Sequence, residues 1–162
     1  MIFSQLDAEQ ASKTSEGIPM PHYGLVDETK MTEAEAALMR ARLHLHGGKR
    51  RLQDGLSAAG IAALYDSVLF GMRYYIAKHK RCASFVQNTD LWDAAGLFQA
   101  LARAGVFDDP LTFNHFSLIV ERALWQESFS FDADATLAEV EEMLRKLGVM
   151  PFNESTFPGE SL

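Results

Sequence analysis

The chain has 162 residues, of which 48% are apolar and 23% are charged, and its 22 acidic and 15 basic side chains give a net charge of −7. This length fits one domain, and the apolar share is that of an ordinary globular protein rather than a disordered one. The acidic balance argues against a protein that coats nucleic acid through a broad basic surface, because phosphate neutralisation needs clustered lysine and arginine. No DNA partner is therefore expected.

One cysteine and the lack of a long apolar run bear on the compartment. Cys82 is the single cysteine and cannot form an internal disulfide, so an oxidising compartment is not required. No segment approaches the roughly 18–20 uninterrupted apolar residues of a membrane span. Residues 1–10 lack the basic region and apolar run of a secretory signal. The sequence predicts a cytoplasmic protein without a membrane partner.

The first 30 residues show no sustained period and are interrupted by glycine and proline between Gly17 and Gly24, which predicts an irregular N-terminal arm. Thr32 and Glu35 then form a capping box at the start of a first helix. Its apolar stripe recurs at alternating spacings of three and four: Leu38, Ala41, Leu45, Gly48 and Leu52. Because the stripe stays in phase across the Gly47-Gly48 pair, we expect one long helix whose small residues let another helix approach closely.

Four further helices are expected, each bounded by a helix-breaking glycine or a capping side chain. The expected boundaries are Gly55 before the second helix, Thr89 or Asp90 and Gly105 around the third, Asp109-Pro110 before the fourth, and Asp132 or Asp134 and Gly148 around the fifth. The second helix carries an almost unbroken apolar face and should be central. No segment alternates with period two. The sequence therefore predicts an all-α, up-and-down bundle of about five helices over residues 31–148, followed by an irregular tail over 149–162.

Motifs with a defined chemistry are few. The chain has no glycine-rich phosphate loop, no GxSxG, no HExxH and no CxxC pair. His79 and Cys82 are two ligands where zinc needs at least three, so neither a metal nor a cofactor is predicted. His44 and His46 would point about 160° apart on a helix and are interpreted as solvated surface residues.

The central helix holds one polar pair beside its apolar stripe. Asp66 and Arg73 are seven residues apart and therefore lie on one side of the helix. One interpretation is a semi-buried ion pair or a contact with a neighbouring helix. The other is a pocket formed by Asp66 and Arg73, in which the planar fork of Arg73 holds the phosphate of a nucleotide or another anionic small molecule.

The aromatic residues of the second half of the chain are Phe107, Phe113, Phe116, Trp125, Phe129 and Phe131. Stacking surfaces for single-stranded nucleic acid interleave such residues with lysine and arginine. Here acidic residues surround them instead. They are therefore interpreted as core residues and dimer contacts.

The run LQDGLSAAGIAALYDSVLFGMRYY, from Leu52 to Tyr75, resembles the junction of helices 1 and 2 in HEPN (higher eukaryotes and prokaryotes nucleotide-binding) domains. In that family a glycine after the first helix leads into an alanine-rich second helix with a tyrosine-containing centre. The order of helices over residues 31–148 also fits. The resemblance implies a non-enzymatic module that forms a homodimer and binds a protein partner such as a nucleotidyltransferase-like protein, with toxin–antitoxin pairs as one setting.

The same resemblance implies an alternative function. Ribonuclease members of the family carry an arginine, four to six residues and a histidine at a dimer cleft, and act on RNA without a metal. Arg73 to His79 fits this spacing, and so does Arg40 to His46. In a ribonuclease, His79 would take the 2′-hydroxyl proton and Arg73 would stabilise the phosphorane. The active members often begin the motif with Arg-Asn in a later helix, which neither match does, so the non-enzymatic module is preferred.

Overall fold

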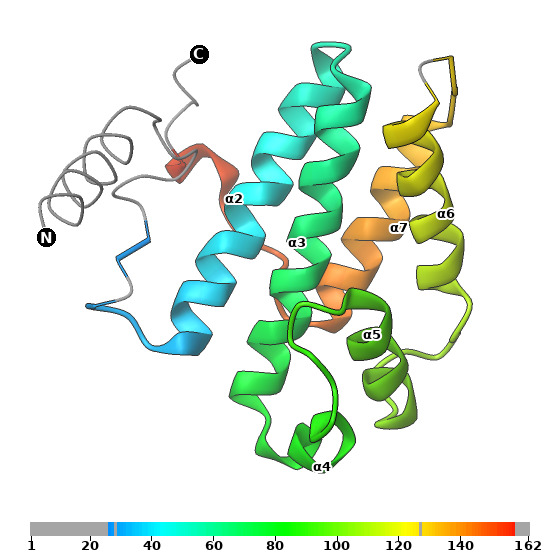
Figure 1. The fold of residues 1–162 in the computed structure, drawn as a ribbon. Helices are drawn as coiled ribbons and strands as arrows, with labels where there is room; N and C mark the ends of the chain where they lie inside the picture. The colour runs from blue at the N-terminus through cyan, green and yellow to red at the C-terminus, as the bar shows by residue number, and fades with distance from the viewer. Residues whose placement is uncertain (1–25, 28, 127, 158–162) are drawn as a thin grey trace, which may run out of the picture.

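The structure, a computed structural model, describes residues 26–27, 29–126 and 128–157. These residues form six α-helices and two short 3₁₀ helices without a strand, which confirms the all-α class (Figure 1). The elements in chain order are α2 (Glu33–Gln53), α3 (Ser57–Lys78), η1 (Lys80–Cys82), α4 (Ala83–Val86), α5 (Ala94–Arg103), α6 (Thr112–Trp125), α7 (Ala133–Lys146) and η2 (Glu154–Thr156). Nearly all of the predicted N-terminal arm lies outside the described residues.

Helices α2 and α3 form a long antiparallel hairpin that turns at Gly55. The predicted capping box opens α2: Thr32 Oγ1 accepts from the Glu35 amide at 3.2 Å, and the Glu35 carboxylate accepts from the Thr32 amide at 2.8 Å. The helix runs unbroken through Gly47-Gly48, as expected. A Cβ at Gly48 would lie 2.9 Å from Leu64 Cδ2. The small residues of the stripe therefore allow the two helices to pack closely.

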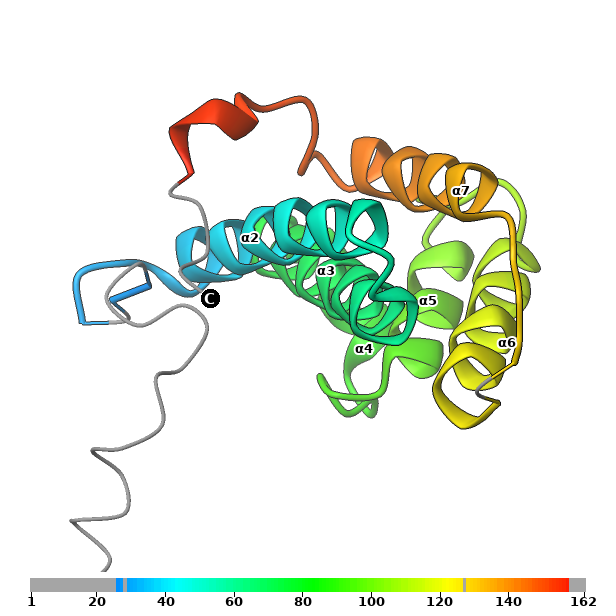
Figure 2. The ribbon, with the colours of Figure 1, turned by 90° about the horizontal axis from the view of Figure 1, so that it is seen from above.

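Helix α3 is the central element, which confirms the prediction for the second helix. It contacts α2 on one side and α5, α6 and α7 on the other. The view from above shows α2 and α6 at opposite sides of the bundle (Figure 2). The interior between α3, α5 and α6 is aromatic: Phe98, Phe113 and Phe116 are at most 1% exposed, and Phe98 stacks on Phe113 at 5.2 Å between ring centroids.

Two helices begin later than the sequence indicates. Asp90 and Asp109 do not cap helices. The Asp90 carboxylate accepts a hydrogen bond from the Trp92 amide at 3.0 Å, and the Asp109 carboxylate accepts one from the Leu111 amide at 2.9 Å. Such turns use the same side chain as an N-cap but leave the backbone outside the helix. The third predicted helix therefore begins at Ala94, and the fourth begins at Thr112.

The fifth predicted helix starts where expected, with Asp132 accepting from the Ala135 amide at 3.0 Å. The short helices η1 and α4 were not predicted. None of the helices in the described part of the chain is long and apolar enough to span a bilayer.

The segment after α7 packs along α2. Arg42 Nε donates to the Val149 carbonyl at 3.0 Å, and Lys49 lies 2.8 Å from Glu154 and 3.2 Å from Glu141. Apart from η2, this segment is irregular over its described residues. It covers the side of α2 that faces away from α6 (Figure 2).

Candidate functional site

Arg73 lies in an aromatic environment rather than an ionic one. Its guanidinium carbon is 4.4 Å from the centroid of the Trp92 ring and 5.5 Å from that of Phe70. The Nε and Nη1 atoms of Arg73 are buried, and neither has a hydrogen-bond acceptor among the described residues. A buried donor without an acceptor costs about 1–3 kcal/mol, and more when it is charged. This side chain is therefore the feature of the structure that most calls for an explanation.

Phe70 is the centre around which the neighbouring side chains gather. The Arg40 guanidinium carbon lies 5.5 Å from the Phe70 ring centroid. The His44 ring stacks on Phe70 with 5.5 Å between centroids and 4° between planes, and Trp92 meets Phe70 edge-on at 6.1 Å. We refer to Arg40, His44, Phe70, Arg73 and Trp92 as the Phe70 cluster.

Helical spacing and close packing bring this cluster together. Arg40 and His44 are four residues apart on α2, and Phe70 and Arg73 are three apart on α3, so each pair shares one helix face. The two faces meet because α2 and α3 pack closely, and Ser67 ties them by donating to the Ala41 carbonyl at 2.7 Å. The loop before α5 then adds Trp92, which is 64% exposed.

A pocket of about 290 Å³ adjoins the cluster at the N-terminal end of α2. Its lining residues are Met31, Thr32, Glu33, Ala36, Ala37, Arg40, Phe70 and Arg73. The two arginines favour an anion there. Glu33 is the acidic member among the lining residues that the structure describes, and both Glu33 and Glu35 lie in the first turn of α2, at the positive end of its dipole. Alanine and Phe70 supply apolar walls. Such a pocket suits a small ligand with one anionic group and an apolar part.

Asp66, which the sequence places on the same side of α3 as Arg73, is not joined to it. No hydrogen bond or ion pair between these two side chains occurs in the described part of the chain, and burial raises the pKa of the Asp66 carboxyl. The pKa of Tyr65 is raised by burial first, then by the negative charge of Asp93 and last by that of Asp66. The ion-pair interpretation of Asp66 and Arg73 therefore finds no contact to support it.

Arg73 and His79, the pair with ribonuclease spacing, lie in different surroundings. Six residues along a helix turn a side chain by about 120°. His79 ends α3, and its ring lies 4.1 Å from the ring of Tyr75. Arg81 secures this end by donating to the Tyr75 hydroxyl at 2.9 Å and to the Ala104 carbonyl at 3.2 Å.

Arg40 and His46, the second pair with the ribonuclease spacing, also lie in different surroundings. Arg40 lies over Phe70, whereas His46 lies 3.7 Å from the Glu154 carboxylate on the side of α2 that the C-terminal segment covers. The structure thus brings together the arginines of the two matches and separates each from its own histidine. The histidine that joins them is His44, which sequence analysis assigned to the solvated surface.

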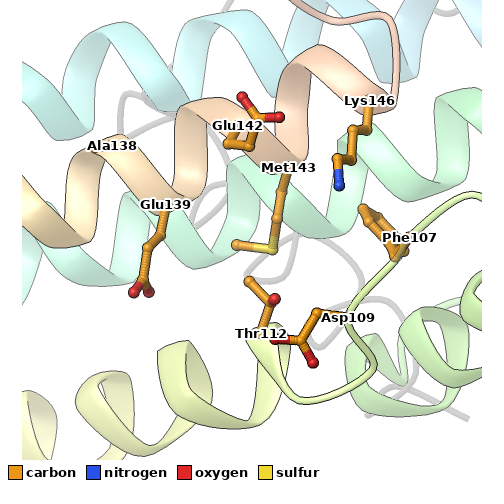
Figure 3. Close-up of a pocket in the computed structure, with 8 residues that line it drawn as sticks. All are labelled: Phe107, Asp109, Thr112, Ala138, Glu139, Glu142, Met143 and Lys146. Atoms are coloured by element: carbon orange, nitrogen blue, oxygen red, sulfur yellow. The ribbon is translucent and has the colours of Figure 1, made fainter.

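A second pocket, of about 330 Å³, lies between α6 and α7. Figure 3 shows Met143 of α7 pointing across this groove toward Thr112 of α6, with carboxylates at its rim. Two of the three lining carboxylates have basic partners: Glu139 is 3.1 Å from His115, and Glu142 is 3.2 Å from Arg145, whereas Asp109 accepts from the Leu111 amide. The carboxylates of Glu139 and Glu142 are therefore partly compensated by neighbouring basic groups.

Among the described residues, no group of three or more histidine, cysteine or carboxylate side chains could hold a metal ion. Cys82 is fully buried.

Trp92, Phe70 and His44 are the members of the Phe70 cluster that sequence reasoning missed. The spacings Arg40–His44 and Phe70–Arg73 were visible in the sequence, but the approach of Trp92 depends on how a loop folds back.

Comparisons with known proteins gave no match: neither a family model, nor a curated protein, nor a solved structure matches this chain. Function is therefore inferred from the residues and their geometry.

Proposed function

We propose that this protein binds a nucleotide or another anionic small molecule, without transforming it, in the pocket between α2 and α3. The observation that carries the proposal is the guanidinium of Arg73, whose two buried nitrogen atoms Nε and Nη1 have no acceptor among the described residues. An oxyanion of a phosphate or carboxylate would supply an acceptor to either of these atoms, and a planar guanidinium binds such a group through two parallel hydrogen bonds, from Nη2 together with either Nε or Nη1.

The charge around Arg73 supports an anionic ligand. Arg40 lines the same pocket and adds a second guanidinium, while Glu33 and Glu35 already lie at the positive end of the α2 dipole. Asp66, the nearest acidic residue along α3 on that side, forms no ion pair with Arg73 in the described structure. The positive charge of Arg73 is therefore not neutralised by the residue that the sequence offers for that role.

Trp92 determines how a ligand reaches Arg73. Its indole lies over the guanidinium at 4.4 Å and helps to bury Nε and Nη1, yet Trp92 itself is 64% exposed and precedes α5 in a turn. A cation–π contact at an exposed site is worth about 0.5–1 kcal/mol, which a charge-assisted hydrogen bond exceeds. An anion that binds Arg73 should therefore move Trp92, which makes this indole a reporter of binding.

Fluorescence tests the proposal directly. Trp92 and Trp125 are the only tryptophans, so Trp125→Phe leaves Trp92 as the sole reporter. We expect its emission to change and saturate during titration with inorganic pyrophosphate or adenosine monophosphate. In this background, Arg73→Lys should weaken binding by about tenfold, because lysine keeps the charge and loses the planar fork.

The matched control is Arg103→Ala, which removes an exposed arginine at the end of α5. Its affinity should equal that of the parent protein, whereas Arg73→Ala should abolish the saturable change. Equal losses in the two variants would show that the anion senses only net charge, and the absence of any saturable change in the parent would refute the proposal. Ribonuclease activity of Arg73 and His79 and binding of a protein partner stay predictions.

A further inference from the structure

Helix α6 presents a line of exposed apolar side chains that nothing in the described structure covers. Leu111, just before the helix, is 65% exposed, Leu118 is 46% exposed and Trp125 is 84% exposed. They recur every seven residues, and a side chain drifts by only about 20° over that interval, so the three form one straight line. The opposite face of α6 carries the buried residues Phe113, Phe116 and Val120.

The position of α6 explains why this line is open. In both views α6 lies at the edge of the bundle, on the far side of α3 from α2 (Figures 1 and 2). Scattered single leucines are normal at a protein surface, but an aligned set that ends in a largely exposed tryptophan is typical of an interaction surface. We refer to Leu111, Leu118 and Trp125 as the α6 line.

We propose that the α6 line is the contact with a second copy of this chain, in which two α6 helices pack antiparallel about a two-fold axis at Leu118. The line is symmetric about Leu118, because Leu111 and Trp125 each lie seven residues from it. A two-fold axis at that point places Leu118 against Leu118 of the partner subunit, and Leu111 against Trp125 of the partner subunit. Because all three side chains are apolar, this axis pairs apolar groups only, as a contact between two identical surfaces requires.

The polar residues beside the line are also complementary in this arrangement. The α6 line has one row of polar residues on each side. When the two-fold axis is perpendicular to the helices, each row faces the same row of the partner subunit. On one flank Asn114 then faces Glu121 of the partner subunit, and an amide can donate to a carboxylate. On the other flank Arg122 faces His115 of the partner subunit and Glu139 of the partner subunit. Within each subunit His115 Nδ1 and the Glu139 carboxylate are 3.1 Å apart. No two carboxylates are placed directly opposite each other.

The size of the contact sets its strength. Helix α6 has 14 residues, so it is about 21 Å long at 1.5 Å per residue. A contact along one such helix covers less area than the ~800 Å² per subunit of a standard stable interface. The dimer should therefore be reversible and should dissociate on dilution.

Sedimentation equilibrium of the full chain over a range of concentrations tests the proposal. The wild-type protein should shift from monomer to dimer as concentration rises. Leu118→Glu should abolish the dimer, because it places two carboxylates face to face at the axis. The matched control is Leu124→Glu, which changes a leucine that is 48% exposed on the same helix and about 100° away from Trp125. Circular dichroism should show that both variants keep the helical fold.

Disulfide trapping tests the register separately. The native Cys82 is fully buried, so an introduced surface cysteine would be the reactive one. Leu118→Cys should cross-link to its own copy under mild oxidation, and Leu124→Cys should not exceed the wild-type level. A monomeric wild type at all concentrations, equal effects of the two glutamate variants, or equal cross-linking of the two cysteine variants would each overturn the proposal.

Discussion

The close packing of α2 on α3, which assembles the Phe70 cluster, depends on the lack of a side chain at Gly60. A Cβ at this position would lie 2.8 Å from Cγ and Cδ2 of Leu52 and 3.1 Å from the Leu52 amide nitrogen. The two closest atoms belong to the Leu52 side chain, and Cγ is bonded directly to Cβ, so it can leave only through a change of rotamer within the packed helix contact. We therefore expect Gly60→Ala to destabilise the protein, although alanine is the better helix former.

Two opposing effects set the magnitude. Overpacking of a helix contact costs about 1–3 kcal/mol. Replacing a helical glycine with alanine gains about 1 kcal/mol. The net loss in the free energy of unfolding should be about 1 kcal/mol. When Leu52→Ala has removed the two closest atoms, the same Gly60→Ala change should become neutral or stabilising.

Urea denaturation of the wild type, the two single variants and the double variant closes the thermodynamic cycle. We expect the double variant to be more stable than the sum of the single changes predicts, with a coupling of about 1–2 kcal/mol. If the effects of the two changes add to within about 0.5 kcal/mol, Leu52 is not what excludes a side chain at Gly60, and the reasoning about this contact is refuted.

Two further predictions concern α3. Ser67→Ala removes the buried hydrogen bond to the Ala41 carbonyl and should lower the free energy of unfolding by about 1 kcal/mol, as measured by urea denaturation. Asp66→Asn should raise it at pH 7, because burial raises the pKa of Asp66 and the unfolded chain therefore loses this proton first as pH increases. The gain should disappear below the ordinary aspartate pKa of 3.8; a gain of equal size at low pH would rule out ionisation as its cause.

The hairpin was predictable because its signals are local. The stripe through Ala41, Leu45 and Gly48 is a property of consecutive residues on one helix, and the same residues are buried in the structure. The capping box at Thr32 is equally local. The late starts of α5 and α6 were not predictable from Asp90 and Asp109, since an aspartate that closes a turn and one that caps a helix carry the same sequence signal. Which of the two forms depends on where the next helix packs.

The sequence identified only part of the candidate site, because contacts between distant segments have no local signal. The sequence singled out Arg73 and offered Asp66 as its partner, because both are on one side of α3. The residue that covers the Arg73 guanidinium is Trp92, which comes from a loop beyond the end of that helix. No helical period encodes this contact. His44 was assigned to solvent by its spacing from His46, whereas its stacking on Phe70 depends on how closely α3 approaches.

The positions of the two arginine–histidine pairs bear on the chemistry that the Phe70 cluster can perform. A spacing of six residues on an unbroken helix turns the two side chains about 120° apart, so Arg40 and His46 face different neighbours, while His79 lies at the end of its helix. A general base must lie within hydrogen-bond reach of the proton that it removes. The Phe70 cluster instead combines the charge of Arg40 and Arg73 with aromatic surfaces. Those groups are of the kind that hold and orient an anion, as the proposed binding function requires.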